Sequence, residues 1–562
     1  MMPASKLLLQ LIFWTLLSNI AIAQPLHLSI LGKNETENKT IDSIGHKKKF
    51  ENFKTLQTEL TSFQQTLNRL GYLESKLENL ERETDSTYIA QFQLNNKYNS
   101  IHIYYSDLQA DLLKTLNIAY HNGYFIASIS ELETTLEKLN IAIANSGDPF
   151  STLELTDFNK IDNKTLSATL KITNNKTRTI DNIVLNGYEK FPKSYIKHFL
   201  KIKRQQSFNL SKIKQQTNLL NDIQFADQIK EPEVLFTKDS TTLYLYIQKK
   251  KANTFDGFLG FGTNTENQKL EFDGYLNLAL VNNLNYGESL KLLYKSDEND
   301  QRTFNLDLSL PYLFKSPIGL EANLNIFRRD SSFVNASQSV NTFYQINSKN
   351  KLSVGISSLN SNNLLDTPST TLEDYNSVFY NFNYSYIKLQ NYDPLFRTNF
   401  LFELSTGFGN RTFSNTKENQ IDLKIRSSKI FNLNDRNSFF TKITGAYLDS
   451  NNYLENELYR FGGINSIRGF EENSILGNLY TVLNTEYRYR LSTNLYVHTV
   501  LDGAYFENQL NNSKEKLFGI GFGFGLLTNT GLFKLNYSNG KTESQKFKFS
   551  DSKIHISVSS TF

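Results

Sequence analysis

The chain has little of what enzymes use for bond chemistry. Its seven histidines are scattered without the spacing of metal ligands, and it contains no cysteine and no Gly-x-Ser-x-Gly sequence. A lipase-type site on the outside of a membrane strand would need an outward serine–histidine pair. His498 and His555 both fall on the polar faces of their segments. We therefore expect no enzymatic activity, no metal and no cofactor.

One arginine is better placed for a specific interaction. Arg468 lies in the stretch Phe461–Phe470 (Phe-Gly-Gly-Ile-Asn-Ser-Ile-Arg-Gly-Phe), within a long insertion between strand-like segments. A guanidinium group is a fixed fork of N–H donors that stays charged in proteins, so away from water it needs a carboxylate. Apolar–polar alternation puts Glu486 and Asp502 on the polar faces of the next two segments. The sequence therefore predicts ion pairs that fix the insertion.

The segments that carry these residues alternate with a period of two from about residue 252 to the C-terminus. Phe304–Leu310 and Ile318–Ile326 are clear examples, with apolar side chains on one face and polar side chains on the other. A soluble β-sandwich would also alternate. There are about sixteen such segments of roughly ten residues, the length of a tilted membrane strand. We therefore expect an all-β, 16-stranded transmembrane β-barrel over residues 252–562.

The insertion has a defined place in this series. Eleven of the predicted strands precede Tyr453 and five follow Gly477. The glycine-rich strand Gly519–Leu526 has room on one face, which would suit either an inserted loop tip or a bend in the wall. The insertion spans residues 452–476.

Residues 24–251 have a different pattern, in which amphipathic helices alternate with short strands in the order β-α-α-β-β. The unit recurs three times with a repeat of about 75 residues. We expect three α+β domains, at residues 24–105, 106–178 and 179–251. An open sheet edge on such a domain can pair with any extended peptide, although the domains could also serve only as spacers.

The N-terminus resembles a secretory signal peptide over residues 1–23. Lys6 gives a positive start, Leu7–Leu17 a short apolar core, and Ala21–Ala23 a cleavage site. The core is too short for a membrane-spanning helix. Net charge is +4, from 60 basic and 56 acidic residues, and no basic cluster indicates nucleic-acid binding.

The Gly462–Gly463 pair followed by Ile467-Arg468-Gly469-Phe470, together with the repeated α+β units, resembles the BamA/TamA-type outer-membrane assembly superfamily. Members combine POTRA domains with a bacterial surface antigen barrel. The resemblance implies that the loop folds into the lumen and that Glu486 and Asp502 anchor it, although here Gly503 follows Asp502 directly. It also implies a loose seam between the first and last strands. The implied C-terminal sorting signal consists of Ile554, Ile556, Val558 and Phe562.

The resemblance also implies a function. The protein would be an outer-membrane assembly or translocation factor that captures unfolded outer-membrane or surface proteins on its periplasmic domains. It would then insert or export them through its barrel. Outer-membrane lipid, periplasmic lipoproteins and chaperones would be further partners. The alternatives are a dedicated two-partner-secretion-type exporter of one surface protein and a passive solute pore.

Overall fold

The computed structural model describes residues 25–106, 110–173, 176–263, 270–296, 301–365, 371–528, 531–546, 548, 550 and 552–561. The predicted signal peptide and Phe562 lie outside these residues. Two compact units divide the chain between Thr179 and Ile180, with residues 207–210 belonging to the first unit. None of the described helices is both long and apolar enough to cross a membrane.

The first domain of the first unit packs two helices on a four-stranded sheet of order β2-β1-β4-β3. Helix α3 (Phe53–Arg69) begins where the Asn52 side chain accepts a hydrogen bond from the Thr55 amide, and its buried face repeats at helical spacing (Leu56, Leu60, Phe63, Leu67). The other elements are β1 (Leu26–Gly32), α2 (Glu35–Ile44), β2 (Lys49–Phe50), β3 (Lys76–Arg82) and β4 (Thr87–Gln93).

The second domain has a five-stranded sheet of order β6-β7-β5-β9-β8. Its elements are β5 (Ser100–Tyr105), α4 (Ala110–Thr115), β6 (Tyr120–His121), β7 (Tyr124–Ser128), η1 (Ile129–Glu131), α5 (Leu132–Asn145), β8 (Thr152–Lys160) and β9 (Thr165–Thr173). The predicted boundary after residue 105 is wrong, because β5 belongs to this second sheet. β5 pairs in parallel with β9, and its Ile101 and Ile103 are buried in the second core.

The third domain opens the second unit. Its elements are β10 (Asn182–Gly187), α6 (Lys193–His198), α7 (Leu210–Asn218), η2 (Leu219–Asp222), β11 (Ala226–Gln228), β12 (Glu233–Phe236) and β13 (Thr241–Lys249). β10 pairs in parallel with β13, while β11 and β12 pair with β13 in antiparallel fashion. The order is therefore the predicted β-α-α-β-β, with the short β11 added.

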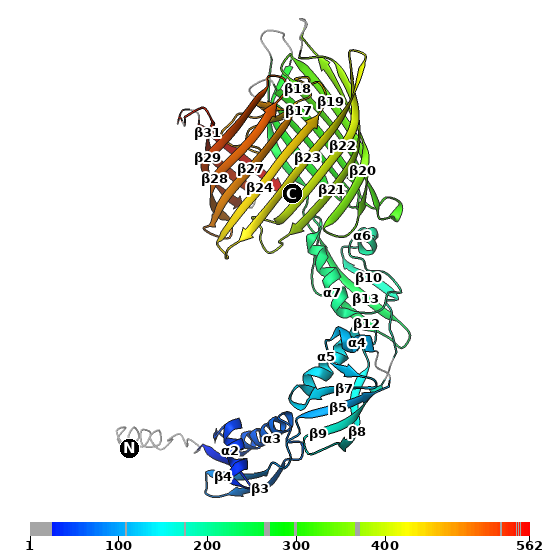
Figure 1. The fold of residues 1–562 in the computed structure, drawn as a ribbon, viewed down its shortest axis with the longest axis vertical. Coiled ribbons are helices and arrows are strands. Elements are labelled where there is room, and N and C mark those ends of the chain that lie inside the picture. Colours follow the sequence, from blue (N-terminus) through cyan, green and yellow to red (C-terminus); the bar gives the residue numbers. More distant parts are fainter. Residues whose placement is uncertain are drawn as a thin grey trace, which may run out of the picture. The chain divides into compact units, whose positions relative to one another are not determined.

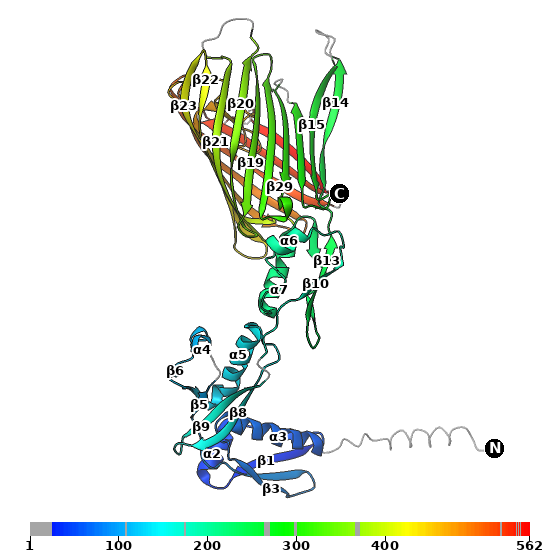
Figure 2. The same ribbon diagram turned by 90° about the vertical axis from the view of Figure 1, so that its right-hand side faces the viewer.

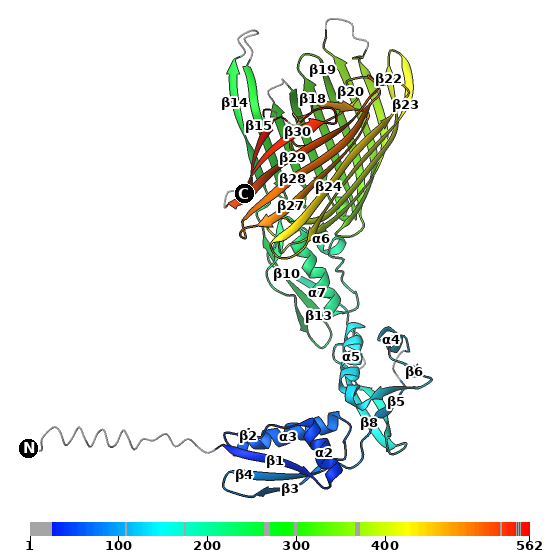
Figure 3. The ribbon, with the colours of Figure 1, turned by 60° about the vertical axis from the view of Figure 1, so that its left-hand side comes forward.

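The rest of the second unit is a closed barrel of sixteen antiparallel strands, which confirms the predicted fold class (Figures 1 and 2). Eleven strands come before the insertion: β14 (Thr254–Thr263), β15 (Leu270–Val281), β16 (Ser289–Ser296), β17 (Gln301–Leu310), β18 (Ile318–Arg329), β19 (Phe333–Gln345), β20 (Asn350–Asn363), β21 (Tyr375–Leu389), β22 (Thr398–Phe413), β23 (Thr416–Asn432) and β24 (Asn437–Asp449). Five come after it: β27 (Leu479–Arg490), β28 (Leu495–Asn508), β29 (Ser513–Thr528), β30 (Gly531–Thr542) and β31 (Ser552–Thr561). Figure 3 views the barrel from the side of β27–β30.

Alternation along the strands separates the two faces of the barrel wall. Asn323 donates to Asp307 at 2.7 Å on the polar face, where Asn305 also lies. On the opposite face, apolar side chains such as Val354 and Ile356 are exposed. An apolar outer surface and a polar lumen are what a barrel in a lipid bilayer requires.

The third domain is docked on the barrel through two tyrosines. The Tyr188 hydroxyl donates to Asn285 at 2.6 Å and accepts from Asn282 at 2.9 Å, both in the β15–β16 turn. Tyr195 of α6 donates to the Gly287 carbonyl at 3.2 Å. Gly287 has φ +82°, and a Cβ there would lie 2.2 Å from the Tyr195 ring. This turn therefore requires glycine.

A substitution at this glycine tests the docking. Gly287→Ala combines a strained φ with a clash against Tyr195, which we expect to cost about 1–3 kcal/mol. The measurement is the rate of tryptic cleavage at the exposed segment Lys249–Lys251, where β13 ends. Because the docked state is destabilised by this energy, cleavage should be at least about fivefold faster. Gly503→Ala is the matched control, because nothing lies within 4 Å of a Cβ at that position. Equal cleavage rates for the two variants would contradict the docking described here.

Candidate functional site

The insertion between β24 and β27 folds back as a loop on a short two-stranded stem. β25 (Tyr459–Phe461) pairs with β26 (Ile475–Gly477), and the loop tip lies between them. The tip begins with the buried pair Gly462 and Gly463. Gly469 has φ +93°, and a Cβ there would lie 2.4 Å from the Gly540 amide of β30. A side chain at Gly469 would therefore keep the tip away from the wall.

Arg468 is 5% exposed and is held by two carboxylates from adjacent strands. Its Nε and Nη2 donate to the two Asp502 oxygens of β28 at 2.8 and 2.6 Å, a bidentate geometry. Its Nη1 donates to Glu486 of β27 at 2.5 Å, and its own amide donates to Asp502 at 3.0 Å. Glu486 also accepts from Arg488 at 2.7 Å. Two guanidinium groups and two carboxylates thus form one charge-balanced cluster.

The balance explains why the cluster survives in a buried place. Burial by itself lowers the pKa of the Arg468 guanidinium. The hydrogen bonds and negative charges of Asp502 and Glu486 outweigh burial and raise that pKa above its ordinary value. Arg468 is therefore a permanent cation. Removal of one partner from such a buried pair costs about 3–5 kcal/mol, because the other charge is left uncompensated.

Apolar contacts also hold the loop tip against the barrel wall. Ile467 is fully buried in a cluster with Phe461 of the stem and with wall residues of β27, β28 and β29: Val482, Ala504, Phe506 and Leu517. A Cβ at Gly519 of β29 would lie 2.3 Å from the Arg468 carbonyl. The glycine-rich strand therefore leaves space for the loop at Gly519. The glycines at 521, 523 and 525 face neighbouring strand atoms instead.

A second ion cluster, on β22 and β23, holds the base of the loop. Arg411 of β22 is fully buried and donates to Glu418 of β23 at 2.6 Å and to Glu457 of the loop. The Glu457 carboxylate also accepts from Gln420 at 3.0 Å. Next to it, Glu455 pairs with Arg329 of β18 at 2.8 Å. The base of the loop is thus tied to the wall, as its tip is.

The loop also touches both sides of the barrel seam. Among the described residues, β14 and β31 share two residue pairs, Thr254↔Thr561 and Phe255↔Ser560, whereas the neighbouring β30 and β31 share eight. Glu471 of the loop pairs with Lys553 of β31 at 3.0 Å, and Glu472 pairs with Lys295 of β16 at 3.5 Å. These side chains are partly solvent-accessible, so the pairs add little stability.

Comparisons with known proteins agree with this architecture. Residues 178–250 match the POTRA family, described as a surface antigen variable number repeat. BamA from Haemophilus ducreyi lacking POTRA domains 1–3 matches with a TM-score of 0.50 at 16% identity, over 83% of this chain and 100% of that one. The chain therefore has a BamA/TamA-type fold.

Two further solved structures are similar to this chain. CdiB from Escherichia coli matches with a TM-score of 0.53 at 14% identity, over 90% of this chain and 97% of that chain. CdiB from Acinetobacter baumannii matches with a TM-score of 0.52 at 15% identity, over 83% of this chain and 90% of that chain. No protein among the curated ones matches the sequence. At these identities the likeness concerns the fold.

The structure brings together most of the candidate residues. Ile467, Arg468 and Gly469 lie against the barrel wall, and Phe470 packs beside them. Glu486 and Asp502 are the two carboxylates that Arg468 contacts. On β31, Ile554 and Ile556 are exposed. The Val558 side chain and Phe562 lie outside the described part of the structure.

Sequence reasoning missed the second cluster. Its signal is a hairpin: the β22–β23 turn at Ser414–Asn415 puts Arg411 directly opposite Glu418 in the antiparallel register. A cross-strand arginine–glutamate pair facing the lumen could have been found in this way. Glu457 lies in a segment without periodicity, so the sequence pattern could not have identified it. Among the described residues, no group of His, Asp and Glu side chains could hold a metal ion.

Charge balance at Arg468 is testable by substitution. Arg468→Met leaves one net negative charge buried, which we expect to cost about 3–5 kcal/mol and to lower the temperature at which the compact barrel unfolds on a denaturing gel. Arg468→Met/Asp502→Asn restores the balance around Glu486 and Arg488 and should recover part of the loss. Arg426→Met is the control, since its ion pair with Glu403 is exposed at 3.6 Å. Equal unfolding temperatures for Arg468→Met and Arg426→Met would contradict the claim that Arg468 holds the loop in the barrel.

The second cluster can be tested with a cysteine reporter, because the chain has no cysteine of its own. Leu454 at the loop base is 4% exposed, so Leu454→Cys should react slowly with a maleimide. Arg411→Met leaves Glu418 and Glu457 without their cation, and we expect labelling at least about tenfold faster. Ile467→Cys reports on the tip in the same background and should accelerate much less. An unchanged rate at Leu454→Cys would show that Arg411 does not hold the base.

Proposed function

We propose that this protein is an outer-membrane assembly or translocation factor that captures unfolded proteins on its α/β domains and inserts or exports them through its barrel. One observation carries the proposal: the BamA-type barrel has its lumen occupied by a loop that two buried ion clusters hold. A passive solute pore has no use for such a loop. The protein performs no bond chemistry in this account.

The domain organisation follows from the same proposal. Residues 1–23 are a signal peptide, and two POTRA-like domains divide between β4 and β5. POTRA domain 3 covers residues 179–251, and the barrel with its loop 452–476 covers residues 252–562. The α/β domains lie in the periplasm and the barrel lies in the outer membrane.

Client capture would use open sheet edges. β3 is an edge strand of the first sheet, and β8 is an edge strand of the second. An edge strand presents unpaired backbone N–H and C=O groups, which pair with an extended peptide with little regard for its sequence. β3 reads Lys-Leu-Glu-Asn-Leu-Glu-Arg, and such charged side chains discourage pairing between two copies of the edge.

Insertion into the membrane would use the seam. The β14–β31 contact has two residue pairs in the described part of the chain, so few backbone hydrogen bonds oppose its opening. Loop contacts with β16 and β31 lie on both sides of this seam. We propose that Arg468, held by Glu486 and Asp502, fixes the loop and thereby sets the conformation of the barrel. Ile554, Ile556, Val558 and Phe562 remain the proposed sorting signal.

The proposal predicts the outcome of depletion in living cells. Quantification of the outer-membrane proteome before growth fails should show a broad loss of barrel proteins. Loss of one or a few surface proteins, with other barrels intact, would instead indicate a dedicated exporter. An unchanged proteome with altered solute permeability would contradict both and favour a pore. Re-expression of Arg468→Met should restore less of the proteome than re-expression of the Arg426→Met control.

A further inference from the structure

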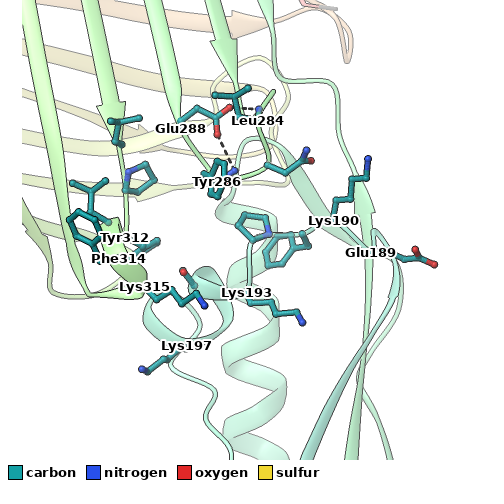
Figure 4. A pocket seen from close by; sticks show the side chains of 17 residues that line it. Glu189, Lys190, Lys193, Lys197, Leu284, Tyr286, Glu288, Tyr312, Phe314 and Lys315 are labelled. Carbon is teal, nitrogen blue, oxygen red and sulfur yellow. Dashed lines mark hydrogen bonds between the residues drawn. The ribbon is translucent and has the colours of Figure 1, made fainter.

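A pocket of about 730 Å³ lies where the third domain meets the barrel. Residues 189–194 and 197, at and around the start of α6, form one side, and the β15–β16 and β17–β18 turns form the other. Figure 4 shows the pocket with its lining side chains. Leu310 lines it too, and Leu310 pairs with Leu320 at the end of the outward apolar face of the barrel. The pocket therefore lies at the edge of the membrane-facing surface.

The pocket is rich in cations. Lys190, Lys193, Lys197 and Lys315 line it, and all four are exposed and form no ion pair with the described residues. Two acids also line it. The carboxylate of Glu288 is occupied, because it accepts from the amides of Leu284 at 2.6 Å and Tyr286 at 3.0 Å. Glu189 is exposed. The pocket therefore carries an excess of positive charge.

The barrel side of the pocket presents large apolar side chains to the outside. Phe314 is 97% exposed, Tyr286 72% and Leu284 69%. The two turns that carry these side chains are held in place. Glu288 closes the Leu284–Glu288 turn, and α6 holds the Phe314 turn. In the latter turn Tyr312 packs edge-on against Tyr195 at 4.9 Å, and His198 donates to the Lys315 carbonyl at 2.9 Å.

The Phe314 turn also stores backbone strain. Tyr312, Phe314 and Lys315 all have positive φ, between 52° and 60°. Residues other than glycine rarely adopt this conformation, which is strained for an L-amino acid. In this strained turn, the Phe314 ring points away from the protein and lies beside the lysines of the pocket.

We propose that this pocket binds an anionic glycerophospholipid of the adjacent bilayer leaflet. The phosphate and its negative charge are held by Lys190, Lys193 and Lys197, and the acyl chains lie against Leu284, Tyr286 and Phe314. Cations beside exposed apolar and aromatic groups, at the edge of an apolar barrel face, match the layered chemistry of a lipid headgroup and its chains. The inference goes beyond the proposed transport function and rests only on its placement of the barrel in a membrane.

A single-tryptophan protein makes this testable. Trp14 is the only tryptophan of the chain, so Trp14→Phe with Phe314→Trp gives one reporter at the pocket. The full chain is reconstituted in vesicles that contain brominated phosphatidylglycerol or brominated phosphatidylcholine, and the quenching of tryptophan fluorescence is compared. Each lysine near an anionic surface contributes about a factor of five in binding. We expect quenching by the phosphatidylglycerol at lipid fractions at least about tenfold lower.

Two controls separate the site from general membrane contact. Lys190→Gln/Lys193→Gln/Lys197→Gln should abolish the preference for phosphatidylglycerol. The matched variant Lys212→Gln/Lys230→Gln/Lys238→Gln removes the same charge from the same domain outside the pocket and should retain the preference. Val354→Trp, on the exposed outer face of β20, should be quenched equally by both lipids.

Several outcomes would overturn the inference. Equal quenching of the Phe314→Trp reporter by both lipids would mean that the pocket does not select anionic lipid. Quenching at Val354→Trp alone would mean that the pocket faces something other than lipid, such as a client segment. Loss of the preference in millimolar inorganic phosphate would mean that it binds phosphate alone. Absence of quenching at both positions would contradict the membrane placement, and so would count against the proposed function as well.

Discussion

A buried guanidinium group that must keep its charge is the constraint on which the lumen of this barrel depends. Arg468 reaches the wall on a loop, and it is stable there only because Asp502 and Glu486 lie on adjacent strands, where both contact its guanidinium group. That requirement fixes the register of β27 and β28 relative to the loop. It also explains the small residues at Gly469 and Gly519, which allow the backbone of the tip to approach the wall.

The strength of contacts differs sharply around the barrel. β22 and β23 share fourteen residue pairs, and Arg411 and Glu418 connect them to the loop base through Glu457. Among the described residues, the seam between β14 and β31 has two pairs, and the ion pair that connects the loop to β31 is exposed. A barrel built in this way has a rigid wall on one side of the loop and a weak wall on the other. The third domain is docked on turns near the beginning of the barrel, through Tyr188 and Tyr195.

Alternation made the barrel predictable, because each strand residue faces either lipid or lumen. The same alternation, combined with the family resemblance, placed Glu486 and Asp502 on the side of Arg468. It did not find Arg411, whose loop partner Glu457 lies in a segment without periodicity. The predicted domain boundary at residue 105 was wrong because the alternation of Ser100–Tyr105 indicates a strand but not the sheet to which that strand belongs. Its parallel pairing with Thr165–Thr173 depends on tertiary structure, which a local pattern does not contain. The lysine pocket also depends on tertiary structure, since its two sides are about a hundred residues apart.

The most direct test of the central claim is amide hydrogen exchange in the loop of the reconstituted full chain. The account predicts slow exchange over Ile467–Phe470, because Ile467 is fully buried and the Arg468 amide donates to Asp502. Arg468→Met should accelerate that exchange at least about tenfold, and the wall strands β22 and β23 should keep their protection. Fast exchange at the tip of the parent protein, or an unchanged rate in Arg468→Met, would contradict a loop that is locked in the lumen by this arginine.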